Sequence, residues 1–521
     1  MRILDFRPDS YRNLTPHTIR FTRQPEAPME EGCSIRFLVG KNGTGKTNIL
    51  RFLTSIFIAI EEGFANPRSD SPAYNIPFHL SYQLRQSTIT IESKGSGRSG
   101  LRVQVSEKDK DTLTYDGNLP SLDLFFPKNI LVYTSGDQNE WQTIFHPTPP
   151  EDDENIGELD LSTRRPEDER PPAQKAYIPD ESSASDSPKP DSDQPEGFSP
   201  SGYRRVNLAT SNQLKLALLS ALLDHQFRGL ETSALKDALQ EVNVRLLGFS
   251  LQIHLNKETV ITPQQRRALN ALYDLASFPN QRWDDQQWVY DINQLSYETR
   301  EPLLNRLING SWKDPFQLFQ TLVSLQDSNI LTDVKLVLEY TPQQAEKPKR
   351  VLLSDDLSDG EFAFLSRMAL IYLLNEEECL FLLDEPEVHF NDDWKRNLVD
   401  SIERALRGTQ SEVILTSHAS IVLTDAYPDE VILMTHYGQD DNIPLTFAAE
   451  QGEVLRHLFD SERSVGRRAM RKVESMLETG TAQEIESLLE KVGPGYYRFK
   501  IVRELENRVP PTEQDNVSAP K

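Results

Sequence analysis

The 521-residue sequence has little cysteine and lacks any long hydrophobic run. Cys33 and Cys379 are its only cysteines, and each lies beside a strongly apolar stretch, so we expect two buried thiols rather than a disulfide or a metal pair. This usage fits a reducing compartment. The first ten residues lack the apolar core of a signal peptide, and no stretch reaches the ~20 apolar residues of a membrane-spanning helix. We therefore expect a cytoplasmic chain that does not enter a membrane.

Two further absences limit the classes of function. No heptad pattern runs through enough turns for a long coiled coil, and no set of Cys and His residues has the spacing of a zinc-bearing HNH nuclease. A Toprim nuclease would need a Glu and an Asp-x-Asp pair on a further sheet, but the chain after Gln451 has a helical pattern and Asp440-Asp441 lies in a polar turn. We expect no nuclease domain in this chain.

Acidic residues outnumber basic ones, which gives a net charge of −24 and a pI near 4.9. Broad coating of DNA requires a basic surface, so this composition disfavours it. Residues 151–200 contain 15 acidic and 5 basic side chains, and so contribute −10 of the total. The rest of the chain is therefore less acidic than the total suggests, and a local basic groove is compatible with it.

Apolar patterning divides the chain into units. Strand-like runs around one helix occupy the N-terminal part, and a second region rich in motifs follows residue 335. Between them, a segment dense in Pro, Ser, Asp and Glu cannot bury enough apolar surface to fold, so we predict a disordered linker; an acidic DNA mimic or a regulatory flap is the alternative. The predicted units are an N-terminal lobe (1–145), this acidic insertion (146–201), a mainly helical insertion (202–334) with a strand at Gly248–His254, a C-terminal lobe (335–445), a helical C-terminal region (446–508) and a disordered tail (509–521).

A glycine-rich segment follows the apolar run Ile35–Val39 and precedes an amphipathic helix expected over Asn48–Glu61. It fits the phosphate-loop pattern G-x-x-x-x-G-K-[ST] in full, in the strand–loop–helix context that the pattern requires. Backbone N–H groups of such a loop surround phosphate oxygens, and the helix N-terminus adds positive potential. We predict an ATP site with Lys46 on the β- and γ-phosphates and Thr47 as a Mg²⁺ ligand. Its residues are Gly40, Lys41, Asn42, Gly43, Thr44, Gly45, Lys46 and Thr47.

Two acidic residues end the apolar run Leu380–Leu383, as in a buried parallel strand that presents carboxylates at its C-terminal edge. Asp384 is predicted to hold Mg²⁺, directly or through water. Glu385 is predicted to be the general base that polarises the attacking water. Gln138 follows another strand candidate and is our candidate for a further contact to Mg²⁺ and water, but a plain surface turn explains its segment nearly as well.

A short polar motif precedes a predicted helix and lies about twenty residues before Asp384. Its serine and glycine, at a helix N-terminus, offer a hydroxyl, backbone N–H groups and the helix dipole to a phosphate. Ser358 followed by Glu361 is also an ordinary capping box, and the two interpretations are compatible. The motif consists of Leu357, Ser358, Asp359, Gly360 and Glu361. Its position before the acidic strand favours a resemblance to the signature of ABC-type ATPases, and this resemblance implies a contact with ATP bound to a second copy.

In this order, the motifs resemble those of the head domain of ABC-type ATPases, whose signature is usually written LSGGQ. Asp359 and Glu361 depart from that consensus. The resemblance implies an α/β fold: a P-loop ABC-type ATPase head with a mixed β-sheet and flanking helices, an inserted, mainly helical subdomain and a small helical C-terminal tail. It also implies ATP and Mg²⁺ as cofactors, and two copies that meet head to tail to complete each site.

The same resemblance assigns roles to two further segments. Val413–Thr416 is an apolar strand candidate, and His418 just beyond it is expected to contact the γ-phosphate and to act in catalysis with Glu385. The run Pro386–Trp394, directly after Glu385, corresponds to the D-loop, which crosses the dimer interface near the other copy's phosphate loop. Its candidate residues are Glu387, His389 and Asn391.

More narrowly, the motifs LSDGE, LLDEPEVHFNDDW and TSHAS resemble those of SMC and OLD-type proteins, and most of all those of restriction-system-associated and PtuA-like ATPases of Septu and retron anti-phage defence. Asp392 stands where these families often have proline. The similarity implies a sensor or regulatory subunit that responds to a nucleic acid or another phage-derived trigger. Its implied partners are further copies of itself, in a homodimer or higher even oligomer, and a nuclease effector of HNH type or a restriction enzyme.

Three other interpretations compete with this one. A binding module that uses ATP only as structural glue is disfavoured by the presence of Glu385 and His418. An SMC- or RecF-like ATPase of DNA repair or recombination, which binds DNA directly, is the main alternative. The missing coiled coil and the acidic composition count against it. Membrane transport is disfavoured because the inserted region has a polar composition and resembles no coupling partner of a transporter.

Overall fold

The structure is a computed structural model. It describes residues 1–22, 33–65, 71–107, 110–117, 119–136, 138–145, 204–228, 234–254, 261–263, 265, 266, 268, 269, 272, 278–280, 287–292, 315–342, 348–374, 378–459 and 465–508. The segments predicted to be disordered, 146–201 and 509–521, lie outside these residues. Within them, neither cysteine forms a disulfide, and no helix is both long and apolar enough to span a bilayer.

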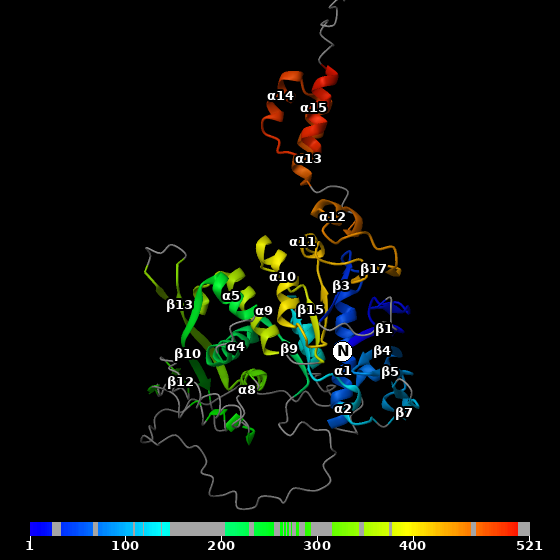
Figure 1. Ribbon diagram of the computed structural model, residues 1–521, viewed down its shortest axis with the longest axis vertical. Helices are drawn as coiled ribbons and strands as arrows, with labels where there is room; N and C mark the ends of the chain where they lie inside the picture. Colours follow the sequence, from blue (N-terminus) through cyan, green and yellow to red (C-terminus); the bar gives the residue numbers. More distant parts are fainter. Residues whose placement is uncertain are drawn as a thin grey trace, which may run out of the picture.

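A seven-stranded sheet forms the centre of the molecule (Figure 1). Its neighbouring strands are parallel except for the pair β17 and β18. The apolar runs that end near residues 39, 384 and 416 are confirmed as three of its buried strands. In sheet order, the strands are β18 (Gly438–Asp440), β17 (Val431–Thr435), β3 (Ser34–Gly40), β16 (Glu412–Thr416), β15 (Leu380–Asp384), β8 (Ile130–Thr134) and β9 (Val206–Ala209).

The inner strands are buried on both faces, which explains why each is a continuous apolar run. In β3, Leu38 joins the hydrophobic cluster on one face of the sheet, whereas Phe37 and Val39 join the cluster on the other. Leu382 and Leu383 of β15 divide in the same way. Because parallel strands end at one edge of a sheet, the polar residues that follow β3, β15 and β16 are brought together there.

A long helix and a second sheet cover one face of the central sheet and share a single hydrophobic cluster with it. The helix, α1 (Lys46–Ala65), confirms the one expected after the glycine-rich loop. The second sheet is antiparallel throughout. Its order is β2 (Ile19–Arg20), β1 (Arg2–Pro8), β4 (Phe78–Leu84), β5 (Ser87–Ser93), β6 (Leu101–Glu107) and β7 (Leu113–Asp116), and the short helices α2 (Leu122–Phe125) and α3 (Gln138–Phe145) flank β8 in the chain.

Helices from two parts of the chain cover the opposite face, in the larger hydrophobic cluster. Those that follow the signature segment and strands β15 and β16 are α9 (Asp359–Leu373), α10 (Asp392–Ala405) and α11 (Ser420–Leu423). The insertion contributes α4 (Leu214–Arg228), α5 (Ala234–Val242) and α8 (Pro315–Asp327). Both α4 and α5 pack against α9, so the insertion lies directly on the helix that the signature segment begins.

The insertion contains more strand than the sequence predicted. Its strands form a five-stranded antiparallel sheet, and the predicted strand at Gly248–His254 is the second half of a longer one. A bulge between Leu246 and Gly248 interrupts the alternation of buried and exposed residues, which hides the first half from a search for period-two patterns. The sheet also extends past the expected end of the insertion at residue 334, because β13 crosses this boundary and β14 lies beyond it. The order is β11 (Phe278–Asn280), β12 (Gln287–Ile292), β10 (Val244–His254), β13 (Leu331–Tyr340) and β14 (Arg350–Leu353).

Four helices follow the central sheet within the described part of residues 446–508, where the sequence predicted helices. The first, α12 (Gln451–Phe459), packs on α11 and buries Val454 and Leu458 in the larger cluster. The other three form a separate bundle with its own small core, which stands beyond α12 in Figure 1. They are α13 (Arg467–Thr479), α14 (Ala482–Leu489) and α15 (Tyr496–Arg508).

Candidate functional site

The loop between β3 and α1 has a backbone that only glycine adopts without strain. Gly43 and Gly45 have φ angles of +82° and +93°. A Cβ atom on Gly45 would lie 2.5 Å from Cδ2 of Leu14, and one on Gly40 would lie 2.2 Å from the carbonyl oxygen of Met434. The strand thus ends in a tight turn that leads straight into the first turn of α1, at the carboxyl edge of the sheet.

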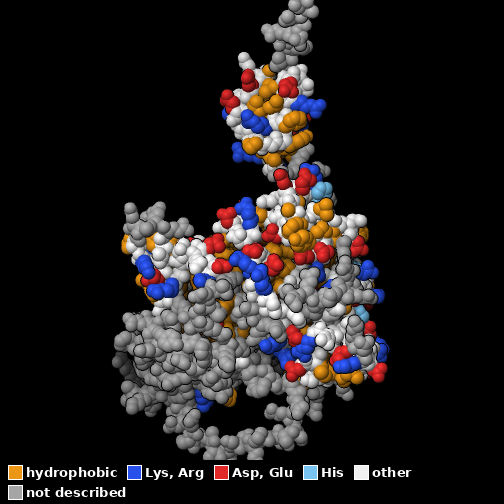
Figure 2. Space-filling view, in the orientation of Figure 1, with side chains coloured by type: hydrophobic (Ala, Val, Ile, Leu, Met, Phe, Trp, Pro, Cys, Tyr) orange, Lys and Arg blue, Asp and Glu red, His pale blue; other side chains and the backbone are white. Residues whose placement is uncertain are grey.

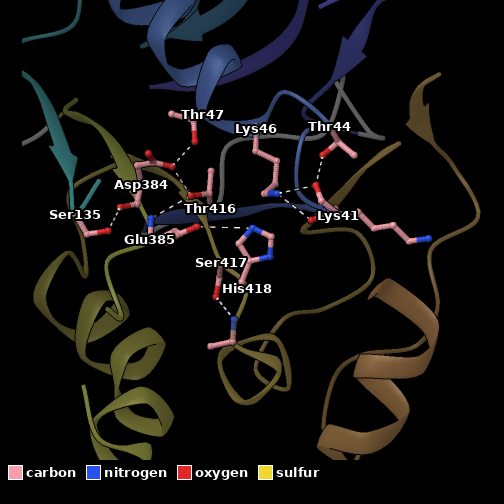
Figure 3. Close-up of polar contacts among 12 residues, drawn as sticks. Lys41, Thr44, Lys46, Thr47, Ser135, Asp384, Glu385, Thr416, Ser417 and His418 are labelled. Carbon is pink, nitrogen blue, oxygen red and sulfur yellow. Dashed lines mark hydrogen bonds and ion pairs between the residues drawn. The ribbon is translucent and has the colours of Figure 1, made fainter. Parts of the chain in front are cut away.

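Lys46, the first residue of α1, folds back into this loop. Its Nζ donates hydrogen bonds to the carbonyl oxygens of Gly40 at 2.8 Å and Lys41 at 3.1 Å (Figure 3). Burial lowers the pKa of Lys46 to about 8, against the opposing attraction of Glu385 and Asp384. The ammonium group therefore lies inside the loop, hydrogen-bonded to backbone carbonyls that an anion can replace.

Two side chains from separate elements meet at Asp384, the last residue of β15. Thr47 of α1 donates a hydrogen bond to Asp384 Oδ1 at 3.0 Å, and Thr416 of β16 donates to the same oxygen at 2.7 Å (Figure 3). The hydroxyl of Thr47 and the carboxylate of Asp384 are oxygen donors of the kind that Mg²⁺ prefers. The residues present therefore fit this ion.

Glu385 and His418 face each other beside this cluster. His418 Nε2 lies 3.7 Å from Glu385 Oε1, and the Glu385 backbone N–H donates to Thr416 Oγ1 at 3.0 Å. Glu385 has a φ of +50°, an unusual backbone conformation that is typical of functional sites. Burial raises the pKa of its carboxyl group, with a further rise from the neighbouring charge of Asp384. Burial, and then the charge of Lys46, lower the pKa of His418, which favours the neutral imidazole.

The candidate D-loop residues differ in their surroundings. Glu387 is only 4% exposed, and its Oε1 accepts hydrogen bonds from the Ser417 hydroxyl and, at 3.3 Å, from the His418 backbone N–H. The Glu387 carboxyl group therefore supports the turn that carries His418 in its own chain, and its suggested contact with a second copy stays a prediction. Asn391 caps α10 by accepting a hydrogen bond from the Trp394 backbone N–H at 2.8 Å. Only His389 combines exposure with a strained backbone, at a φ of +72°.

The signature segment forms the N-terminus of α9 with a capping box. Ser358 Oγ accepts a hydrogen bond from the Glu361 backbone N–H at 3.3 Å, and the Glu361 carboxylate accepts from the Ser358 backbone N–H at 2.9 Å. Ser358 and Asp359 are exposed. A Cβ atom on Gly360 would lie 2.9 Å from the carbonyl oxygen of His389, so the glycine permits close packing of the signature segment against the D-loop.

A family model described as "AAA domain, putative AbiEii toxin, Type IV TA system" matches residues 35–424. The chain belongs to this family. The match runs from β3 to α11 and so includes the phosphate loop, the signature segment, the acidic strand and His418. Together with the central sheet, it shows the fold class that the sequence predicted, a P-loop ATPase head of mixed α/β architecture.

Two solved structures are also similar to this member of the family. The crystal structure of an SmcHead bound to the C-winged helix domain of ScpA is 11% identical, with 83% of this chain and 94% of that chain covered and a TM-score of 0.31. The Smc head domain with an extended coiled coil, bound to the C-terminal domain of ScpA derived from Pyrococcus furiosus, is 12% identical, with 83% and 92% covered and a TM-score of 0.28. No curated protein matches the sequence.

Several residues at the site of this AAA-domain protein carry no recognisable motif. Asn13, in the turn between β1 and β2, donates a hydrogen bond to the carbonyl oxygen of Gly43 at 2.8 Å and accepts one from Asn48 at 2.6 Å. It thereby joins the phosphate loop to the first turn of α1. A lone asparagine in a polar turn gives no sequence signal, because its role depends on β1 lying beside the loop in space.

A carboxylate joins the same turn to α3. Glu140 of α3 pairs with Arg12 at 2.8 Å and also with Arg51 of α1. The contact positions α3, which begins at Gln138, next to the phosphate-loop helix. The side chain of Gln138 itself lies outside what the structure describes, so its suggested contact with Mg²⁺ stays a prediction.

Arg367 of α9 is buried between three elements of the site. Its guanidinium donates hydrogen bonds to the hydroxyl of Tyr133, in β8, and to the carbonyl oxygen of Val388 at 2.8 Å. It also lies over the ring of Phe390, 4.8 Å from the centroid. The arginine thus ties the signature helix to the D-loop and to the end of β8. In the sequence it is one basic residue within an apolar helix, so its role could not be anticipated.

The end of α12 lies against the catalytic candidate His418. The rings of His418 and Phe459 have centroids 5.7 Å apart, and Phe459 is the last residue of α12. The sequence indicated a helix here, but not that its final residue reaches the edge of the central sheet. Among the described residues, no group of three or more His, Cys, Asp or Glu side chains is arranged to hold a metal ion.

Proposed function

We propose that this chain binds ATP with Mg²⁺ at Gly40–Thr47 and hydrolyses it to ADP and phosphate. The observation that carries the proposal is the meeting of Thr47, Asp384 and Glu385 beside Lys46, in a member of an ATPase-domain family. A phosphate loop alone indicates that a nucleotide binds, but not that it is hydrolysed. The acidic pair at the end of the neighbouring buried strand supports hydrolysis as well as binding.

In this proposal, each polar group at the sheet edge has one task. Lys46 exchanges the carbonyls of Gly40 and Lys41 for the β- and γ-phosphate oxygens, and the loop's N–H groups hold the same phosphates. Thr47 and Asp384 would hold Mg²⁺, with Thr416 fixing the carboxylate. The ion would supply positive charge beside the phosphates, which offsets the negative charge that develops during hydrolysis.

Glu385 acts as the general base, because it follows Asp384 directly and its carboxyl group has a raised pKa. A proton from the attacking water passes to Glu385 as the water oxygen approaches the γ-phosphorus. His418 stays neutral at physiological pH and directs its Nε2 toward the same carboxylate. Its neutral ring positions the water without competing for the base's negative charge.

We further propose that two copies complete each site. Ser358 and Asp359 are exposed at the N-terminus of α9. The Ser358 hydroxyl donates to the Glu361 carboxylate at 2.7 Å within the capping box, and in the dimer it would turn to the γ-phosphate on another molecule, which the helix N-terminus also attracts. His389 is exposed on the D-loop, which packs against the signature segment at Gly360. It is the candidate for a contact across the same interface. ATP then joins the copies, and hydrolysis by Glu385 releases them.

As a biological role, we propose a sensor or regulatory subunit of a prokaryotic anti-phage defence system that works with a partner nuclease. Two observations support it: the resemblance of the LSDGE, DEPEVHFNDDW and TSHAS segments to PtuA-like ATPases, and the family's description as a putative toxin of a toxin–antitoxin system. The nuclease expected is an HNH-type protein or a restriction enzyme. A plating assay with phage tests the role: the native gene cluster should protect cells, and Lys46→Ala should abolish protection.

Glu385→Gln tests the hydrolysis proposal directly. The variant should lose about 10²- to 10⁴-fold in kcat and still bind ATP, so that it accumulates as an ATP-bound dimer in size-exclusion chromatography with light scattering. Glu486→Gln, an exposed carboxylate on α14, is the matched control and should behave as wild type. A wild-type protein without ATPase activity, or a Glu385→Gln variant with full activity, would refute the proposal.

A mixing experiment tests whether the signature acts between copies. The Lys46→Ala and Ser358→Arg variants should each be inactive alone. In a homodimer of either variant, both ATP sites lack one of the two residues that they require. Mixed chains should regain part of the activity, since one site of a mixed dimer combines an intact Lys46 with an intact Ser358. Ser487→Arg, at an exposed position of α14, controls for the added charge. No recovery on mixing, with both variants folded, contradicts the arrangement in trans.

A further inference from the structure

The C-terminal bundle has two parallel helices whose N-termini lie at the same end. Arg508, the last residue of α15, donates hydrogen bonds to the carbonyl oxygens of Leu477 and, at 2.6 Å, Gly480, at the end of α13. The C-termini of α13 and α15 therefore lie together, and so do the N-termini. Packing among the three helices maintains this arrangement through the small core of Val473, Ile485 and Ile501.

Charge is segregated along these two helices. Residues 465–473 and 495–503, at the N-terminal end of the bundle, contain seven basic side chains and no acidic one. The acidic residues of α13 and α15 begin only at Glu474 and Glu504. The end of α14 lies here too, because Arg498 donates to the carbonyl oxygens of Leu489 and Val492, and it adds one acidic and one basic side chain, Glu490 and Lys491. Within the chain's net charge of −24, this end thus keeps an excess of basic side chains, and the N-termini of α13 and α15 add positive potential. Its exposed basic residues are Arg467, Arg468, Arg471, Lys472, Arg498, Lys500 and Arg503.

Two aromatic side chains lie exposed among these charges. Tyr496 is 70% exposed and Phe499 63% exposed. Positions 496, 499, 500 and 503 follow helical spacing, so on α15 the two rings share one face with Lys500 and Arg503. The opposite face of α15 supplies Tyr497 and Ile501 to the core. Figure 2 shows basic and apolar side chains side by side on the bundle. The exposed rings are therefore not needed to hold the bundle together.

We propose that this end of the bundle binds single-stranded nucleic acid. Unpaired bases stack on exposed aromatic rings while the phosphates between them contact arginine and lysine, and this combination is found across single-strand-binding proteins. A duplex would satisfy the charges but offers base edges rather than base faces to a side chain. An acidic protein surface would also satisfy the charges, but it would leave the rings of Tyr496 and Phe499 without a planar group to stack on. The proposal does not depend on ATP hydrolysis.

Fluorescence anisotropy with the full-length protein tests this site. The probes are a labelled 20-nucleotide single-stranded DNA, the RNA of the same sequence and the corresponding duplex, each titrated at three salt concentrations. Phe499→Ala should weaken single-strand binding roughly 5- to 100-fold, because one stacked base is lost. Arg467→Gln/Arg468→Gln/Arg471→Gln should lower the slope of log affinity against log salt by about 2. ATPase activity should not change in either variant.

Controls separate the site from general surface effects. Tyr437→Ala removes an aromatic ring that is 96% exposed near the phosphate loop, and Arg350→Gln/Arg407→Gln removes basic charge elsewhere; both should bind as wild type. Thermal unfolding followed by circular dichroism verifies that each variant is folded. Equal affinity for duplex and single strand, or no effect of Phe499→Ala, would overturn the proposal. Absence of nucleic-acid binding combined with salt-sensitive binding of poly-glutamate would assign the surface to an acidic protein instead.

Discussion

The imidazole of His418 packs against the ring of Phe459, with the two ring centroids 5.7 Å apart, and its Nε2 lies 3.7 Å from Glu385 Oε1. Phe459 ends α12, and the chain continues from it to the C-terminal bundle, whose first helix begins at Arg467. A catalytic candidate is therefore in direct contact with the helix that leads to a separately packed unit. Any event that shifts α12 changes the surroundings of His418.

Phe459→Ala should lower kcat for ATP several-fold while leaving the Kd for ATP within about twofold. The ring restricts the imidazole without touching the phosphate loop, and removing it frees the imidazole to rotate. Steady-state kinetics together with equilibrium binding of a fluorescent ATP analogue separate the two effects. Phe459→Tyr should restore most of kcat. Equal losses in kcat and affinity would show that the contact is only structural.

ATP affinity should fall above pH 8. The pKa of Lys46 is lowered to about 8 in the free protein, and phosphate binds the charged ammonium. Below pH 8 the lysine is already protonated; above it, binding requires uptake of a proton, so affinity should drop by up to about tenfold per pH unit. Titrations at pH 7, 8 and 9 measure the effect. Lys46→Arg should bind more weakly but with a flat profile over this range, since arginine does not lose its proton.

Glu412 should make folding less favourable as the pH rises. Its carboxyl group is fully buried, and burial raises its pKa from 4.5 to about 7, although the Ile3 backbone N–H at 2.6 Å opposes the rise. The folded state then favours the protonated form, so stability is lost between about pH 4.5 and 7, by about 2–3 kcal/mol. Urea unfolding of wild type and Glu412→Gln at pH 5 and 7.5 isolates this contribution, and the variant should lose less stability between the two values.

Glu387 should support catalysis through the turn that carries His418. Glu387→Ala removes the acceptor for the Ser417 hydroxyl and the His418 N–H, which should cost about 1–3 kcal/mol in stability and lower kcat about tenfold. Glu387→Gln keeps an acceptor oxygen and should retain most of the activity. Urea unfolding and ATPase assays check both variants. If Gln is as damaging as Ala, the negative charge rather than the hydrogen bond is what the site requires.

The sequence predicts several strands of the central sheet, because these strands are buried on both faces and are followed by recognisable motifs. The run before Gly40 and the run before Asp384 were recognised in this way, and the capping box at Ser358 was predicted from residue types alone. Each signal is local, within a dozen residues. Parallel pairing then brings the strand ends together without further information.

The remaining contacts join residues distant in the sequence and leave no local signal. Asn13 reaches Gly43, and Phe459 reaches His418, only because separate elements pack side by side. Glu387 accepts a hydrogen bond from Ser417, a residue 30 positions further along the chain, and nothing in the local sequence indicates that contact. The bulged strand β10 was underestimated because one irregular residue pair conceals its alternation.

The distance along the chain between Thr47 and Asp384, 337 residues, also has a consequence for biosynthesis. At a translation rate of roughly 5–20 residues per second, about 20 s to a minute passes between their addition to the nascent polypeptide. Over that time β3 has neither of its two sheet neighbours, β16 and β17, because both come later still. A ribosome that stalls in this interval leaves an apolar strand with open edges, the kind of segment that pairs with other chains and requires a chaperone.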